Sequence, residues 1–154
     1  MANEIADACF GKKAQDETFI TSNLLPQPHK LNADTWRNIE KLEEKIARKE
    51  EWAIDGPVFG TRPETIGRDK VAVPDYCYKV DVFVEDGKID VLAFEVPENT
   101  APTTNIEQFL VPLKKLRSDT HINFFPDLPS AVESALENRD AKASWKDAMD
   151  LIQK

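Results

Sequence analysis

The sequence contains few of the residues that usually form metal or redox sites. Its two cysteines, Cys9 and Cys77, and its two histidines, His29 and His121, stand far apart and form no Cys-x-x-Cys, His-x-x-x-His or Cys-His spacing. This scarcity argues against a zinc knuckle and against the dense disulfide framework of small secreted proteins. Two free thiols are then the default, which leaves the cellular compartment unknown.

Glycine-rich loops and long apolar runs are also missing. The chain has 5 glycines and shows neither a phosphate-cradling loop nor a Gly-x-Ser-x-Gly elbow, which excludes the P-loop and α/β-hydrolase motifs. No apolar run reaches the ~20 residues of a membrane span, and the first residues lack the apolar core of a signal peptide. We therefore expect no membrane partner, and the localisation stays unknown.

Basic residues are in the minority. The chain carries 28 acidic and 20 basic residues, a formal net charge of −8, so it is not a uniformly basic protein that coats nucleic acid or anionic membranes. This charge still allows a local basic groove. With 154 residues, of which 41% are hydrophobic, the chain can bury one core, which predicts a single domain.

Strand and helix patterns alternate along the chain. Asp86-Gly87 between two runs of strand-forming residues predicts a hairpin. Apolar residues at helical spacing predict a helix from Asn32 onward: Trp36, Ile39, Leu42 and Ile46. The full set of expected elements is strand 18–25, the helix from 32, strand 52–60 broken at Gly56 and Pro57, hairpin strands 76–84 and 89–96, helices at 104–107 and 113–117, strand 121–129, and terminal helices over 130–154.

The order of these elements predicts an α+β fold, with one antiparallel sheet and helices packed against it. The hairpin strands are rich in apolar and aromatic residues, which favours a sheet with a buried face. Four charged residues in these strands are interpreted as marking a solvent-facing side of the sheet: Lys79, Asp81, Asp90 and Glu95.

The stretch HKLNADTWRNIE, from His29 to Glu40, contains the most informative spacing. Asn32 stands where the helix begins, and Trp36 and Glu40 follow four and eight residues later, near one helical face. Asparagine at such a position is usually a helix N-cap, and a glutamate on a helix is usually a solvated charge. From spacing alone, a cap and a ligand both remain open for Asn32.

The sequence around this stretch resembles a known family. The run DETFITSNLLPQPHKLNADTWRNIEKLEEKIAR and the later segments GPVF, KVAVPDYCYKV and FLVPLKKL are similar to the DNA/RNA non-specific endonucleases, which have the ββα-metal nuclease fold. The resemblance extends from Ala14 to Pro126. The residues that carry it in the first run are Ser22, Asn23, Pro26, Gln27, Leu31, Asn32, Trp36 and Glu40.

This resemblance implies a Mg²⁺-dependent nuclease that hydrolyses phosphodiester bonds of DNA or RNA. Asn32 matches the one direct protein ligand of the magnesium ion, and Glu40 matches the glutamate that holds a metal-bound water. A neutral amide oxygen is a hard ligand that suits Mg²⁺. Asn23 is expected to support both residues from a neighbouring strand, and Arg37 and Lys41 are expected to contact nucleic acid.

Two departures from the family pattern change the expected activity. Four residues after the glutamate the family commonly has an arginine that contacts phosphate, and this chain has Glu44 there. Lys41, Lys45 or Arg48 would have to replace it. The Asp-Arg-Gly-His element, which carries the general base of such enzymes and precedes the asparagine, is missing. We therefore expect an N-terminally incomplete domain that is weakly active or inactive without this element.

Two alternatives to an endonuclease domain remain open. The first is a non-catalytic relative that binds nucleic acid or a partner protein, because a glutamate replaces the arginine and the net charge is negative. The second is a structural homodimer module, built on the hairpin and the terminal helices. An Asp-Arg-Gly-His element in an upstream reading frame would favour the enzyme.

Overall fold

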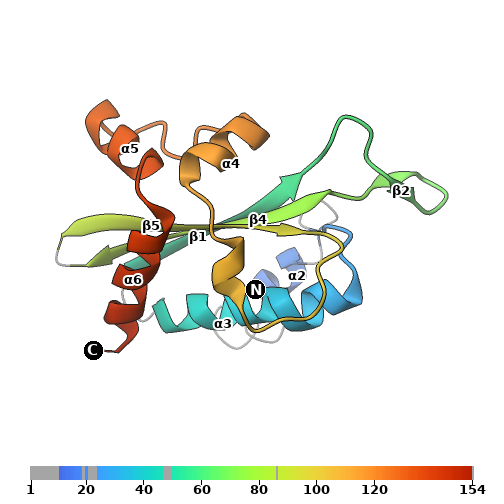
Figure 1. Ribbon diagram of the computed structural model, residues 1–154. Coiled ribbons are helices and arrows are strands. Elements are labelled where there is room, and N and C mark those ends of the chain that lie inside the picture. The colour runs from blue at the N-terminus through green and yellow to red at the C-terminus, as the bar shows by residue number, and fades with distance from the viewer. Residues whose placement is uncertain (1–10, 19, 21–23, 47–49, 86, 154) are drawn as a thin grey trace.

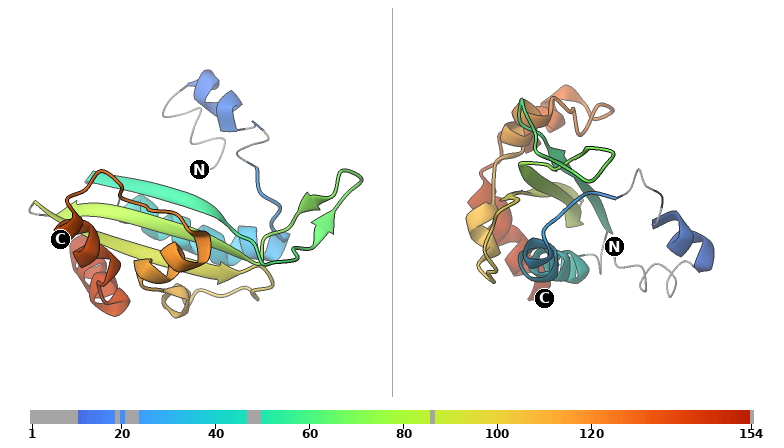
Figure 2. Two further views of the ribbon diagram at one scale, coloured as in Figure 1. Left: turned by 90° about the horizontal axis from the view of Figure 1, so that it is seen from above. Right: turned by 90° about the vertical axis from the view of Figure 1, so that its right-hand side faces the viewer.

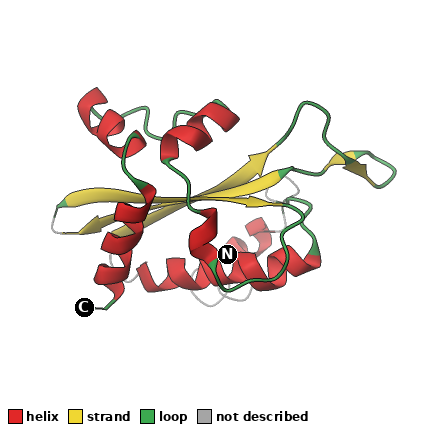
Figure 3. Cartoon of the chain, viewed as in Figure 1, coloured by secondary structure: helices red, strands yellow, loops and turns green. Residues whose placement is uncertain are grey.

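A three-stranded antiparallel sheet in the order β1-β4-β5 lies at the centre of the computed structural model (Figure 1). The model describes residues 11–18, 20, 24–46, 50–85 and 87–153. β1 spans Glu50–Val58, β4 spans Tyr76–Glu85 and β5 spans Lys88–Pro97. Helices cover both faces of the sheet (Figure 3). The predicted α+β architecture, an antiparallel sheet with packed helices, is confirmed.

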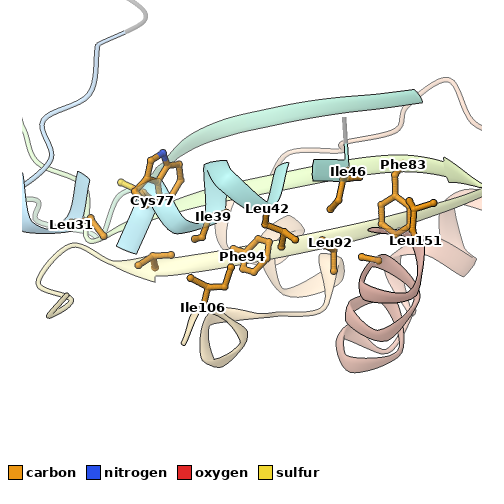
Figure 4. Close-up of a cluster of buried hydrophobic side chains, with 13 residues drawn as sticks. Leu31, Ile39, Leu42, Ile46, Cys77, Phe83, Leu92, Phe94, Ile106 and Leu151 are labelled. Atoms are coloured by element: carbon orange, nitrogen blue, oxygen red, sulfur yellow. The ribbon is translucent and has the colours of Figure 1, made fainter. Parts of the chain in front are cut away.

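One face of the sheet is covered by a continuous helical segment. η2 (Leu31–Trp36) is a π-helical turn that runs directly into α3 (Arg37–Ile46). The predicted apolar stripe is its buried side, and Figure 4 shows Ile39 and Leu42 directed at Phe94 of β5. Burying an aliphatic side chain stabilises the folded state by about 1.5–3 kcal/mol, so this stripe holds α3 against the sheet. α6 (Ala141–Ile152) packs beside α3 and contributes Leu151 to the same apolar cluster.

The opposite face is covered by two short helices, α4 (Leu113–Thr120) and α5 (Ser130–Glu137). Side chains alternate along a strand, so Tyr78, Val80 and Val82 of β4 face these helices while Cys77 and Phe83 face α3. Figure 2 shows α4 and α3 on opposite sides of the strands. The terminal helices predicted over 130–154 are confirmed as α5 and α6.

The predicted hairpin is confirmed. β4 and β5 pair from Tyr76 opposite Pro97 to Glu85 opposite Lys88. Gly87 in the connection has a φ of 75°, a left-handed conformation that glycine adopts without strain. A second, small hairpin of β2 (Thr65–Ile66) and β3 (Val71–Ala72) projects from the end of the sheet (Figure 2).

Gly56 and Pro57 do not break the strand that contains them, contrary to the prediction. Both lie inside β1, opposite Tyr78 and Cys77 of β4. A Cβ on residue 56 would stand 2.5 Å from the hydroxyl oxygen of Tyr78, so glycine is needed where this ring crosses the neighbouring strand. Proline is tolerated because β1 is paired on one side only within the described residues.

Three other predicted elements differ. Residues 121–129 form no strand. His121, which follows the end of α4, has a φ of 58°, and Asn123 Oδ1 accepts a hydrogen bond from the Phe125 backbone N–H at 3.0 Å, which favours a turn. The helix predicted at 104–107 is a 3₁₀ turn, η3 (Ile106–Phe109). Half of the strand predicted at 18–25 falls on residues 19 and 21–23, which lie outside the described residues. Of the other half, residue 18 belongs to α2 (Lys12–Thr18), and residues 20, 24 and 25 form no strand.

The charged residues of the hairpin do not mark a solvent-facing side, so that interpretation was wrong. Lys79 and Asp81 are 1% and 0% exposed beneath α3, and Glu95 is 8% exposed on the opposite face. Two of these buried charges meet partners: Lys79 contacts Glu43 at 2.7 Å, and Glu95 contacts Lys115. None of the helices in the described part of the chain has the length and apolarity to span a bilayer.

Candidate functional site

The helical segment η2–α3 carries both residues expected at the metal site, Asn32 and Glu40. Asn32 is the second residue of η2, its side chain is exposed, and its backbone N–H donates to the Pro28 carbonyl at 3.0 Å. The capping position is Lys30, so Asn32 does not cap the helix. No hydrogen bond joins its side chain to a described residue, which leaves the amide oxygen available to a ligand.

The π-helical turn brings Asn32 closer in line with Glu40. Residues eight apart in an α-helix are offset by about 80° around the axis, because 3.6 residues make one turn. A π turn closes i→i+5 bonds and rotates less per residue, so it reduces this offset. The core explains the turn: Leu31 and Trp36 are both buried, and an α-helix would place residues five apart about 140° from each other.

Glu40 lies on the flank of α3 that faces β1, which we call the acidic flank (Glu40 and Glu43). Its carboxylate is half-buried and makes no hydrogen bond or ion pair with a described residue. Burial raises the pKa of Glu40, the Lys79 ammonium lowers it, and Glu43 and Asp55 raise it further. Glu40 is therefore a carboxylate more basic than usual, which suits a group that accepts a proton or a hydrogen bond from water.

Lys79 of β4 organises the acidic flank from below. Its side chain is 2% exposed, and its Nζ lies 2.7 Å from Glu43 Oε2 and 2.9 Å from Asp55 Oδ1. The ammonium also lies 5.8 Å from the centre of the Trp36 ring. Burial opposes the charge, but the carboxylates outweigh it and hold the Lys79 pKa above its ordinary value. One cation thus joins α3, β1 and β4, and it is near enough to Glu40 to lower the pKa of that carboxyl.

Sequence reasoning missed this role of Lys79. A signal was present in the strand. Lys79 and Asp81 stand between the apolar residues Cys77 and Phe83 on one side of it, and its other side is entirely apolar. A strand covered on both faces can hold charges only where they are paired. The partners Glu43 and Asp55 lie on separate elements, so spacing along the chain did not reveal them.

The cationic side chains Arg37 and Lys41 of α3 are exposed, and so is Glu44, which stands where the family commonly has an arginine. Lys41 and Lys45 line a groove towards η3 and α6, on the flank of α3 opposite Glu43, which we call the basic flank. Asn23, expected to support the site, lies outside the described residues.

The donor chemistry limits which metal the site could hold. Within the described ranges, no group of three or more His, Cys, Asp or Glu side chains could hold a metal ion. The site offers one exposed amide oxygen, from Asn32, and one half-buried carboxylate, from Glu40. These hard donors fit a Mg²⁺ ion that keeps most of its waters, and they include none of the histidine and cysteine ligands on which zinc sites are mostly built.

Comparison with known proteins agrees with this fold. The model of the DNA/RNA non-specific endonuclease family matches residues 1–131. Human mitochondrial endonuclease G is 30% identical over 135 residues, covering 77% of this chain and 45% of that protein. The human mitochondrial nuclease EXOG is 33% identical over 138 residues, covering 77% of this chain and 37% of that protein. This chain therefore spans less than half the length of either relative.

A solved structure shows the same architecture. A chain in the crystal structure of the EndoG/EndoGI complex, described as showing the mechanism of EndoG inhibition, superposes with a TM-score of 0.73 at 23% identity. The match covers 86% of this chain and 60% of that chain. The sheet and its packed helices are thus those of a ββα-metal nuclease fold.

Proposed function

The chain belongs to the DNA/RNA non-specific endonuclease family, and from this membership we propose that it is a domain for Mg²⁺-dependent hydrolysis of phosphodiester bonds. The observation that supports this best is the π turn of η2, because such a turn reduces the angular offset between Asn32 and Glu40 along the helix. Both side chains are left without hydrogen bonds to described residues. Single π turns inside helices occur frequently at functional sites.

Each residue of the site has a distinct task in this proposal. The Asn32 amide oxygen binds the ion without neutralising it, so the full charge of Mg²⁺ can stabilise the negative charge that builds on the phosphate oxygens. Glu40 accepts a hydrogen bond from a water molecule and orients it. Lys79 binds Glu43 and Asp55, so these carboxylates do not compete with Glu40 for the same water or ion.

The general base is the missing part of this machinery. The family element Asp-Arg-Gly-His does not occur in residues 1–154. His121 ends α4 on the far face of the sheet, and His29 is exposed one turn before Asn32. Positioned general-base catalysis contributes typically about 10²–10⁴-fold. We therefore propose that the chain alone cleaves weakly or not at all, and that a segment carrying Asp-Arg-Gly-His supplies the base.

A nicking assay on supercoiled plasmid and on RNA tests the proposal. Residues 1–154 with Mg²⁺ should cleave near background, and an upstream segment with Asp-Arg-Gly-His should raise the rate by about 10²–10⁴-fold. Asn32→Ala in the extended form should abolish the gain, while Asn99→Ala, an exposed asparagine on another loop, should not. Robust nicking by the unextended chain that is lost on Asn32→Ala would mean that another residue, with His29 the first candidate, is the base.

A second candidate function is binding without cleavage. Glu44 is exposed on the outer face of α3, where it adds negative charge at the position of the family's phosphate-contacting arginine. If the extended form stays inactive but retains oligonucleotide binding in EDTA, the chain is a non-catalytic nucleic-acid-binding relative. A partner protein would be favoured if binding to both DNA and RNA is absent.

A further inference from the structure

A groove of about 340 Å³ opens on the basic flank of α3, between α3, η3 and α6. Its volume lies at the lower end of the range for small-ligand sites. Leu42 and Ile106 form an apolar floor, and both are buried. The residues lining the groove are Asn38, Lys41, Leu42, Lys45, Thr104, Asn105, Ile106, Glu107, Trp145, Met149 and Ile152.

One wall of the groove is apolar and aromatic. Trp145, Met149 and Ile152 project from one side of α6, and each is half-buried. Phe94 packs against Trp145 edge-to-face, with ring centres 6.4 Å apart and planes at 84°. This contact anchors the indole while leaving part of it at the groove. The wall therefore offers an indole and a thioether, two groups that pack well against flat rings.

The opposite wall carries positive charge. Lys41 and Lys45 stand one helical turn apart, both are exposed, and neither pairs with a carboxylate of a described residue. Buried Lys79, by contrast, is held by two carboxylates. Among the lining residues, Glu107 alone carries negative charge. In a chain of net charge −8, an apolar groove edged by two available lysines is suited to an anionic ligand.

We propose that this groove binds a segment of single-stranded nucleic acid, with phosphates at Lys41 and Lys45 and a base against Trp145. Alternating cations and an aromatic surface are the chemistry by which proteins hold single strands. The Asn105 amide at the rim can bond to a base edge. An acidic peptide would satisfy the lysines but would leave the indole without a flat partner.

The inference rests on the proposed nuclease function and adds a second contact region to it. A helix with its side chains is about 10–12 Å wide, so the groove and Glu40, on opposite flanks of α3, lie about one helix width apart, a span that a strand of a few nucleotides can cross. Trp145 and Met149 lie beyond residues 1–131, which match the family model. The groove is thus partly built by a helix that this match does not include.

Fluorescence anisotropy with a short fluorescein-labelled oligodeoxythymidine, in EDTA and with residues 1–154, tests the groove without catalysis. Lys41→Ala/Lys45→Ala should weaken binding and reduce the slope of log K against log salt by about 1.4, or about 0.7 for each lost phosphate contact. Trp145→Leu should weaken binding about fivefold or more, while Trp145→Phe should retain it. Matched controls are Lys88→Ala/Lys114→Ala and Trp52→Leu, all at exposed positions outside the groove.

Each outcome decides one question. Equal binding by the groove variants and the controls overturns the inference, and so does absence of binding by the unaltered chain, whatever the plasmid assay shows. Groove-dependent binding together with an extended form that never cleaves supports the groove and contradicts the nuclease proposal. Thermal unfolding of each variant identifies any loss caused by misfolding, and Trp145→Phe still tests the stacking if Trp145→Leu unfolds.

Discussion

At the scale of single residues, the site depends on two neighbouring charges, Lys79 and Glu40, which lie in different surroundings. Lys79 is buried and held by carboxylates from α3 and β1, whereas Glu40 is half-buried and bonded to no described side chain. The first arrangement stabilises the fold. The second costs stability, because burial disfavours the ionised carboxylate, and such costs are common where a group serves function.

Glu40→Gln should therefore stabilise the protein and inactivate the extended form. The pKa of Glu40 is raised in the folded state, so its ionisation opposes folding once the pH exceeds its ordinary pKa. The urea midpoint of Glu40→Gln should exceed that of the parent at pH 8. The difference should vanish at a pH below the ordinary glutamate pKa, where both states are protonated. A lower midpoint at pH 8 would show that Glu40 is instead a stabilising residue.

Lys79→Met should destabilise strongly. Removing one member of a buried charge cluster leaves the others without compensation and costs about 3–5 kcal/mol. Here Asp81, fully buried, would lose the nearby cation, and the partly exposed Glu43 and Asp55 would lose a direct contact. Urea unfolding at neutral pH measures the effect, and Lys114→Met on exposed α4 is the matched control. A change below about 1 kcal/mol would mean that water replaces the lysine.

At the scale of elements, the helical segment η2–α3 contributes both to the hydrophobic core and to the candidate site. Its π turn lets Leu31 and Trp36 both reach the core, and the same turn rotates Asn32 towards Glu40. α3 then separates its charges, with Glu40 and Glu43 on one flank and Lys41 and Lys45 on the other. One helix thus presents a candidate metal site and a candidate phosphate-binding groove.

Deleting Ala33 tests whether the π turn serves the site. The deletion removes one residue from η2, so Leu31 and Trp36 become four apart, and an α-helix can then bury both. Stability should change little, within about 1 kcal/mol. Cleavage by the extended form should be retained, because Asn32 and Glu40 then stand seven apart, which an α-helix places about 20° from each other around its axis. Circular dichroism and the plasmid assay measure the two effects. A fall of cleavage to the level of Asn32→Ala would show that the site needs the π turn itself.

At the scale of the whole molecule, the two apolar clusters share strands β4 and β5. The cluster beneath α3 contains Phe83, Leu92 and Phe94, and the cluster beneath α4 contains Val80 and Val82 of the same sheet. Ion pairs and a hydrogen bond tie the outer segments to this sheet. Arg139, between α5 and α6, pairs with Asp90 of β5, Ser144 of α6 donates to the same carboxylate, and Lys115 of α4 pairs with Glu95. Neither half of the core can be lost without exposing the other.

Unfolding of residues 1–154 should therefore be a single cooperative transition. Near-UV and far-UV circular dichroism should give the same urea midpoint, because both faces of the sheet depend on the same strands. Intrinsic fluorescence offers a third probe, since Trp36 is buried beneath the sheet and Trp145 lies on α6. Two separated transitions would show that α4 and α5 form a unit of their own, and would contradict the single predicted domain.

The sequence by itself determined those features that depend on neighbours a few residues apart. The Asp86-Gly87 turn, the apolar stripe of α3 and the order of family residues around Asn32 were all readable, because turn geometry and helical spacing are local properties. Only the tertiary structure decided the rest. The π turn forms because Leu31 and Trp36 are both buried in the core. Lys79 pairs with carboxylates from two other elements, and Trp145 lines the same groove as Lys41, more than a hundred residues earlier in the chain. Such contacts form between segments far apart in the chain, so the free energy that stabilises them depends on the whole fold and cannot be inferred from a local sequence pattern.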